Sequence, residues 1–417
     1  MNIKSLLLGS AAAMVAVSGA QAADAIVVEP EPVEYVRVCD AYGSGFFFIP
    51  GTETCIRLGG FVRSAYEKVY FDAFNNALAG APTVTSDPSF TLWGQRARLN
   101  VDTRNETEYG TLRALYRLEG GQANTDVDVD MDVALISLAG FRAGFAGANY
   151  WSSNHGFGGV NAESVASNAA GLFYPDGYYG FDDATIFDYT WSGDGLSVTV
   201  GVEDPRISYG RDGFGNVTNN GGTDGRVNFY AGFNYSADFG TIAFTAAHDS
   251  IAPEVTAAGI STDVGGWAYK VSASINLSDF VPGGFVQGWY MNDGDYNTDY
   301  VHTAQQLENP EEIFGVAFQM NLTDEVEFWA NYWHAEGGYG TAGTFAGAII
   351  QEGEADQFGV GLNWFPSATP GFHIKATYFT GAIQDSTSAT LAGLIGAAGG
   401  ISTVDFDGFE ISVRRDF

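Results

Sequence analysis

Short runs of alternating apolar and polar side chains recur from Cys55 to the end of the chain, each about ten residues long. In one of them, Val271, Ala273 and Ile275 alternate with serines. Successive side chains on a strand point to opposite faces, so each run predicts a strand with one apolar face and one polar face. A tilted strand of about ten residues is long enough to cross a bilayer. The runs therefore predict strands that span a membrane.

Sixteen runs fit this description, and they give the expected strand boundaries. They cover residues 55–68, 90–103, 108–119, 126–138, 141–150, 183–191, 195–203, 226–235, 240–248, 266–277, 284–292, 313–322, 325–335, 356–365, 371–380 and 405–417. The least regular stretch is 132–150, where we expect a turn at Gly140 and a bulge.

The connections between these runs alternate between two classes. The tight ones include 104–108, 192–194, 236–239 and 323–324. The long ones include 151–182, 204–225, 291–312, 336–354 and 381–404. Tight turns at one end and long loops at the other are typical of outer-membrane barrels, whereas a soluble β-sandwich has no reason to alternate in this way. The predicted fold class is all-β: a transmembrane antiparallel β-barrel of 16 strands over residues 55–417, with short periplasmic turns and long extracellular loops.

The composition agrees with this class. The chain has 55 glycines, 14% aromatic residues and only 16% charged residues, which suits many turns and an aromatic belt at the membrane interface. Its formal charge of −32 argues against a nucleic-acid partner, which requires a basic surface. The acidic residues crowd the long connections, where they form either solvated loops or sites for divalent cations shared with anionic surface lipids.

The first residues have the layout of an export signal. Lys4 supplies the positive charge, Leu6–Val17 the apolar core, and Ala20-Gln21-Ala22 a small-residue cleavage site. Residues 1–22 are therefore expected to be a cleaved signal peptide, and residues 23–54 a periplasmic N-terminal segment. After residue 22 no apolar run of about 20 residues offers a transmembrane helix.

Two cysteines, Cys39 and Cys55, fall in the exported part of the chain. An even number in an oxidising compartment favours one disulfide between them. The alternative, a metal site, lacks a second Cys or His pair nearby. We therefore expect a disulfide and no metal.

At sixteen strands a barrel is too wide for side chains to fill, and it encloses an aqueous channel. The alternation places six arginines of the first three strands on the inner face, as a basic arc: Arg57, Arg63, Arg96, Arg98, Arg113 and Arg117. On the fourth strand Asp126, Asp128, Asp130 and Asp132 share one face, which predicts an acidic column beside this arc. Alternatively, the arginines are paired wall residues screened by water.

The connection 151–182 is rich in glycine and can fold inward to narrow the channel. Its acidic residues, Glu163, Asp176 and Asp182, would then face the arginines. Such an arrangement sorts solutes by size, charge and dipole. This loop is the expected pore constriction.

The last strand, Phe409–Phe417, has to pair with the first strand near Ile56–Tyr66, because a barrel in lipid can leave no edge unpaired. Its inner residues Glu410 and Arg414 are expected beside Arg57 and Arg63.

Nothing in the chain suggests catalysis or a cofactor. Residues 126–137 resemble a calcium loop only superficially, with Met131 and Ser137 where glycine and glutamate are required. The five histidines are scattered and form no HExxH pair. We expect a protein that is not an enzyme.

Several segments resemble the alphaproteobacterial porins of the rhizobial type: Val36–Gly43, Phe46–Arg57, Thr107–Arg113 and the terminal Phe417. The resemblance implies a homotrimer of outer-membrane barrels in contact with lipid and lipopolysaccharide, and diffusion of small hydrophilic solutes and ions. It also implies an inward-folded third loop and insertion by the barrel-assembly machinery, guided by the C-terminal strand with Phe417. Two other functions stay open. One is a solute-selective channel, for example for sugars, using Tyr174, Tyr178 and Tyr179; the other is a closed-barrel adhesion protein.

Overall fold

The structure is a computed structural model. It describes residues 37–74, 89–123, 126–146, 184–203, 210–211, 217–218, 227–248, 267–293, 310–339, 351–384 and 403–417. The expected signal peptide and the connection 151–182, with Glu163, Asp176, Asp182 and the three tyrosines, lie outside these residues. They stay predictions.

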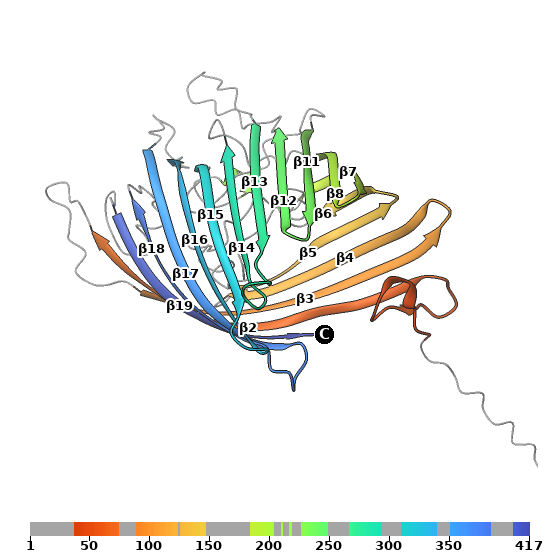
Figure 1. The fold of residues 1–417 in the computed structure, drawn as a ribbon, viewed down its shortest axis with the longest axis horizontal. Coiled ribbons are helices and arrows are strands. Elements are labelled where there is room, and N and C mark those ends of the chain that lie inside the picture. The colour runs from red at the N-terminus through yellow and green to blue at the C-terminus, as the bar shows by residue number, and fades with distance from the viewer. Residues whose placement is uncertain are drawn as a thin grey trace, which may run out of the picture.

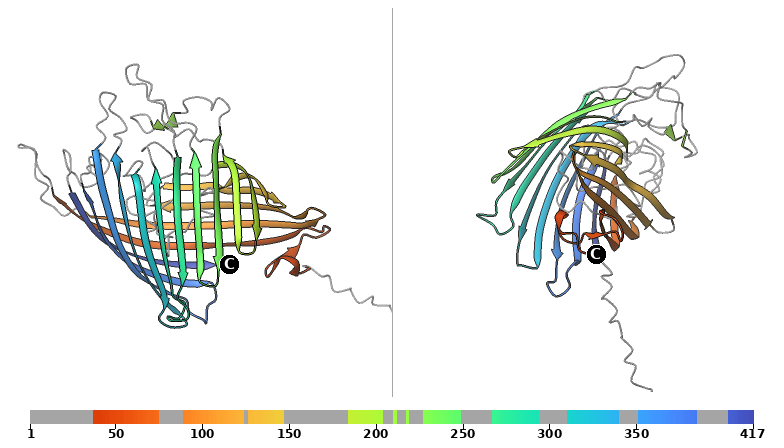
Figure 2. Two further views of the ribbon diagram at one scale, coloured as in Figure 1. Left: turned by 45° about the horizontal axis from the view of Figure 1, so that its top comes forward. Right: turned by 90° about the vertical axis from the view of Figure 1, so that its right-hand side faces the viewer.

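Sixteen antiparallel strands form a closed barrel, which confirms the predicted fold class (Figures 1 and 2). The strands are β2 (Cys55–Phe74), β3 (Ser89–Thr107), β4 (Gly110–Ala123), β5 (Asp126–Leu138), β6 (Phe141–Ala146), β7 (Ala184–Gly193), β8 (Leu196–Glu203), β11 (Asn228–Ala237), β12 (Gly240–His248), β13 (Trp267–Asn276), β14 (Phe285–Asp293), β15 (Pro310–Asn321), β16 (Val326–Tyr339), β17 (Gln351–Trp364), β18 (Phe372–Gln384) and β19 (Thr403–Asp416). Each pairs with its neighbours along this series, and β19 pairs with β2 to close the wall. Outside the series, β1 (Phe47–Phe48) pairs with β2, and β9 (Gly210–Arg211) pairs with β10 (Val217–Thr218).

The apolar side chains face outward, as the alternation predicts. On β13, Val271 is 43% exposed whereas its neighbour Ser272 is buried. On β2, Val62 is exposed and Arg63 is buried. A soluble protein hides its large apolar side chains, so an outer face made of them is suited to lipid. Within the described residues, no helix has the length and apolar character needed to cross a bilayer.

The first strands are longer than their polarity pattern suggested. The expected turn at 104–108 is wrong: β3 continues to Thr107, and the turn consists of Glu108 and Tyr109 before Gly110, which has a φ of 109°. Residues 103–107 are all polar, so the polarity no longer alternates although the strand continues. Arg104 is therefore a strand residue, paired with Arg113. At β6 the structure describes the strand only to Ala146.

The expected bulge lies on β5. Arg117 pairs with Val133 and Leu118 with Met131, which leaves Asp132 without a partner on β4. Before this point the apolar residues point outward, and Met131 is 42% exposed. After it the alternation is reversed, because Val133 is buried. The bulge thus accounts for the irregular pattern of residues 132–150.

The barrel closes close to where we expected, but in a different register. Arg414 pairs with Arg63, as predicted, whereas Glu410 pairs with Glu67. Arg57 has no partner on β19, because the last residue, Phe417, bonds to the backbone of Gly60. Residues 55–59 therefore extend beyond the closed wall.

The N-terminal segment, red in Figure 1, lies beside the ends of β2 and β3. Its disulfide joins Cys39 to Cys55, as predicted, and a short 3₁₀-helix, η1 (Asp40–Tyr42), follows Cys39. The two cysteines and Phe46 form a small buried cluster, against which Tyr42 and Phe48 pack. The segment is thus a compact unit attached to the start of β2.

Candidate pore-lining site

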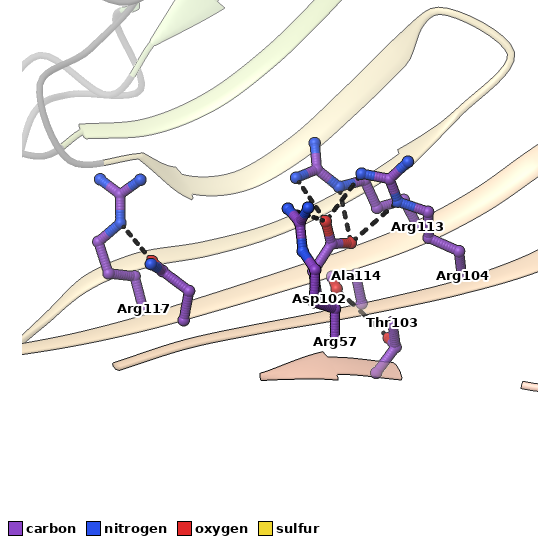
Figure 3. A network of polar contacts seen from close by, with 8 residues as sticks. Arg57, Asp102, Thr103, Arg104, Arg113, Ala114 and Arg117 are labelled. Carbon is purple, nitrogen blue, oxygen red and sulfur yellow. Dashed lines mark hydrogen bonds and ion pairs between the residues drawn. The ribbon is translucent and has the colours of Figure 1, made fainter. Parts of the chain in front are cut away.

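The predicted arginines occupy inner positions on three adjacent strands. Arg57 and Arg63 belong to β2, Arg96 and Arg98 to β3, and Arg113 and Arg117 to β4. Figure 3 shows Arg57, Arg104, Arg113 and Arg117 on the same side of the sheet, with Thr103 on the opposite side. The structure therefore brings the six residues onto one arc of the wall, although it divides five of them into two groups and leaves Arg117 apart from both.

The first group, which we call the Asp102 cluster, consists of Asp102, Arg57, Arg104 and Arg113 (Figure 3). Asp102 is almost fully buried, with 2% of its side chain exposed. Arg104 donates from Nε and Nη2 to the two carboxylate oxygens, at 3.1 and 2.8 Å. Arg113 does the same at 2.9 and 3.0 Å. Arg57 Nη2 lies 3.6 Å from Asp102 Oδ2. Three cations thus share one buried carboxylate.

Aromatic rings of the N-terminal segment cover this cluster. The guanidinium carbons of Arg57 and Arg104 each lie 4.9 Å from the centre of the Phe46 ring. Arg104 also lies 5.8 Å from the centre of the Tyr42 ring. Burial, together with the nearby Glu106, raises the pKa of Tyr42. Cations over aromatic faces are attracted by the ring quadrupole, which partly offsets the repulsion between the arginines.

The second group, which we call the wall belt, consists of Arg63, Arg96, Arg98 and Arg414. Arg63 pairs with Arg414 on one side and with Arg96 on the other, so three arginines stand in line across β19, β2 and β3. Arg96 and Arg98 both form ion pairs with Glu119 of β4, which is 12% exposed.

The guanidinium groups of two wall-belt arginines pack on one aromatic ring of β2. Phe61 is 3% exposed, and the guanidinium carbons of Arg414 and Arg98 lie 4.0 and 5.1 Å from its ring centre. Arg414 also donates to Asp416 Oδ1 at 2.9 and 2.7 Å. The belt is therefore a packed part of the wall, which agrees with the alternative of paired wall residues.

For the remaining predicted residues the structure shows fewer side-chain contacts. Arg117 donates from Nε to Asn100 Oδ1 at 2.9 Å. Asp126 and Asp128 pair with Ala123 and Gly121 of β4, which gives them inner register positions. Their side chains lie outside the described part of the structure, so the acidic column stays a prediction.

The sequence reasoning gave no role to the acids that pair with the arginines. Asp102 and Glu119 alternate in phase with the arginines of their strands, so the sequence did indicate that they share the inner face. The register that brings Glu119 opposite Arg98 could not be read from it. A third polar group was also missed: Arg142 donates to Asp188 at 2.8 and 2.5 Å, and the Tyr230 hydroxyl donates to the same carboxylate at 2.8 Å.

Comparison with known proteins adds independent evidence. Residues 24–389 match the family described as the porin subfamily. The chain is 38% identical over 300 residues to Porin Omp2b of Brucella suis biovar 1 (strain 1330), covering 67% of this chain and 71% of the relative. It is 36% identical over 325 residues to Porin Omp2b of Brucella neotomae, covering 72% of this chain and 77% of the relative.

Solved structures share the fold. The outer membrane channel DcaP of Acinetobacter baumannii superposes with a TM-score of 0.54 at 14% identity, covering 89% of this chain and 99% of that one. An anion-selective porin from Comamonas acidovorans superposes with a TM-score of 0.50 at 14% identity, covering 88% and 100%. At this identity the likeness concerns the fold alone. From the family match, which spans most of the sequence, we conclude that this chain belongs to the porin subfamily and forms a channel in the outer membrane.

Proposed function

We propose that the inner arginines make this channel a general diffusion pore whose wall sorts small hydrophilic solutes and ions by charge. One observation carries the proposal: five guanidinium groups share two carboxylates. Three arginines contact Asp102 and two contact Glu119. Cations in excess on one arc attract anions and repel cations in the water beside them.

Acidic residues are proposed to lie beside these arginines on β5 and opposite them on the loop 151–182. Asp126 and Asp128 hold inner register positions on β5, next to the arginine-bearing β4. The loop 151–182 would bring Glu163, Asp176 and Asp182 into the channel, and its glycines support such a fold. Acids facing arginines would create a field across the pore that orients passing dipoles. Deletion of this loop is expected to raise single-channel conductance and the size limit for neutral solutes.

We also propose how the protein reaches its site. The layout of residues 1–22 supports cleavage of a signal peptide after Ala22. The aromatic C-terminal strand supports delivery by the barrel-assembly machinery, and the apolar outer face supports contact with lipid, with lipopolysaccharide and with two further copies in a homotrimer. We assign no catalytic residue and no cofactor.

Planar-bilayer recording tests the pore. Folded protein, verified by its heat-modifiable migration in gel electrophoresis, is expected to insert in uniform conductance steps, grouped in threes for a homotrimer. Step size should rise in proportion to salt concentration, as for an open aqueous pore. Saturation of the current by low concentrations of one sugar would instead indicate a solute-selective channel, and absence of current would indicate a closed barrel.

A further inference from the structure

The Asp102 cluster lies beyond the end of the closed barrel wall, at the rim with the short turns. Phe417, the last residue of the chain, bonds to Gly60, and Arg57 lies three positions further towards the start of β2. Asp102 pairs with Arg57 across the β2–β3 ladder. The cluster therefore stands apart from the wall belt, at the channel mouth on the side where both ends of the barrel chain lie.

Asp102 has no capacity left for a third arginine. A carboxylate offers about four lone-pair positions to donors. Arg104 and Arg113 already supply four hydrogen bonds to its two oxygens. Arg57 Nη2 is 3.6 Å away, which is beyond hydrogen-bonding distance. Arg57 thus interacts with Asp102 through charge, without a hydrogen bond.

The guanidinium of Arg57 remains available for another acceptor. Its side chain is 47% exposed, the largest fraction among the three arginines. Within the described residues it makes no hydrogen bond, so none of these residues uses its five N–H donors. The Phe46 ring holds the guanidinium in place, and the disulfide ties the segment that carries Phe46 to β2. The donors are therefore both unoccupied and positioned.

Nearby acids do not neutralise the cluster. Three arginines and one aspartate leave two positive charges. Glu106, the next acid on this face of β3, accepts a hydrogen bond from the Thr111 hydroxyl at 3.1 Å. Glu53 of the N-terminal segment lies 3.7 Å from Arg37. Across the described residues, no ion pair joins either acid to Arg57, Arg104 or Arg113.

We propose that the Asp102 cluster binds a small oxyanion of the phosphate type at this mouth of the channel. Arg57 contacts the anion, since a planar guanidinium can donate two parallel hydrogen bonds to its oxygens. Arg104 and Arg113 give the cluster its positive net charge. Asp102 keeps the three guanidinium groups together when the anion is absent. This goes beyond the proposed diffusion pore and does not depend on conduction.

Isothermal titration calorimetry with inorganic phosphate tests the site on the folded, full-length protein in detergent, at constant ionic strength. We expect saturable binding of one phosphate per chain. The R57Q variant should bind at least tenfold more weakly, and R57K should lie between the two because it keeps the charge but loses the planar fork. The matched control is R415Q, which removes a positive charge from an exposed position near the end of β19, where the guanidinium donates to the Pro370 carbonyl. Its affinity should equal that of the unmodified protein.

Two results would overturn the assignment. One is absence of saturable phosphate binding by the unmodified protein. The other is an equal loss of affinity in R57Q and R415Q, which would reveal only a general effect of net charge. Heat-modifiable migration verifies the folding of each variant. Conductance in potassium chloride, measured on the same preparations, keeps the two ideas apart: a conducting protein that binds no phosphate refutes the site alone, and a phosphate-binding protein that does not conduct refutes the pore alone.

Discussion

Gly60 and Phe417 close the barrel through a reciprocal pair of backbone hydrogen bonds. The Gly60 N–H donates to the Phe417 carbonyl at 3.0 Å, and the Phe417 N–H donates to the Gly60 carbonyl at 3.0 Å. Phe417 therefore extends the ladder between β19 and β2 by one residue pair beyond Asp416 and Phe61.

Gly60 has no room for a side chain. A Cβ at this position would overlap the backbone carbonyl of Arg98 and lie 3.1 Å from the tip of the Phe417 ring. The Gly60→Ala substitution should therefore push β2 away from β3 and destabilise the barrel by about 2 kcal/mol, as is typical for overpacking. Urea unfolding of the folded protein in detergent measures this loss.

Gly288→Ala on β14 is the control for this substitution. A Cβ there would meet only the Gly315 carbonyl, at an ordinary contact distance of 3.7 Å. Its unfolding midpoint should stay close to that of the unmodified protein. Equal midpoints for the two alanine variants would contradict the close packing at Gly60.

Deletion of Phe417 should impair assembly and leave selectivity unchanged. The deletion removes both backbone bonds to Gly60 and an outward ring that is 64% exposed. We expect a lower yield of heat-modifiable protein in the outer membrane. The molecules that do fold should give the reversal potential of the unmodified protein, because the inner arginines are unchanged. The Phe417→Tyr variant, which keeps the backbone and the ring, should assemble normally.

Among the acids near the start of β2, Asp102 of β3 is expected to contribute most to stability. Asp102→Asn leaves Arg57, Arg104 and Arg113 close together without their carboxylate. Breaking a buried ion pair from one side costs about 3 kcal/mol or more, and denaturant unfolding should report a loss of this size. The control is Glu53→Gln, whose side chain is 88% exposed and pairs with Arg37 at 3.7 Å. Exposed pairs contribute little, so this variant should unfold like the unmodified protein.

The strands could be predicted because lipid reverses the usual polarity. Outward side chains such as Val62 and Val271 must be apolar, and the inner ones touch water or other polar groups, so the two-residue period is visible in the sequence. The pattern became unreadable where this contrast disappears. Residues 103–107 are polar on both faces of β3, and at Asp132 a bulge reverses the alternation.

The site could be predicted only in part, for a different reason. Alternation shows which face of the sheet a side chain occupies, but not which residue of the next strand lies opposite it. Arg98 and Glu119 were both recognisable as inner residues, yet their pairing depends on the β3–β4 register. In the same way, Glu410 was expected near Arg57 and pairs with Glu67. Which arginines share which carboxylate follows from the register alone.

The central claim is that the inner arginines govern the charge preference of an open channel. The combined variant Arg96→Gln, Arg98→Gln and Arg113→Gln removes two positive charges from the wall belt and one from the Asp102 cluster. Its reversal potential in a potassium chloride gradient should move towards that of a cation-selective pore, because fewer fixed positive charges then attract anions into the channel.

The most direct measurement compares Arg98→Gln with Glu119→Gln in that gradient. The two side chains form one ion pair, so each substitution removes one partner of the same contact. Loss of Arg98 should shift the reversal potential towards cations. Loss of Glu119 should release Arg96 and Arg98 and shift it towards anions. Opposite shifts are the predicted result, and unchanged potentials or shifts of the same sign would contradict a charge-sorting arginine wall.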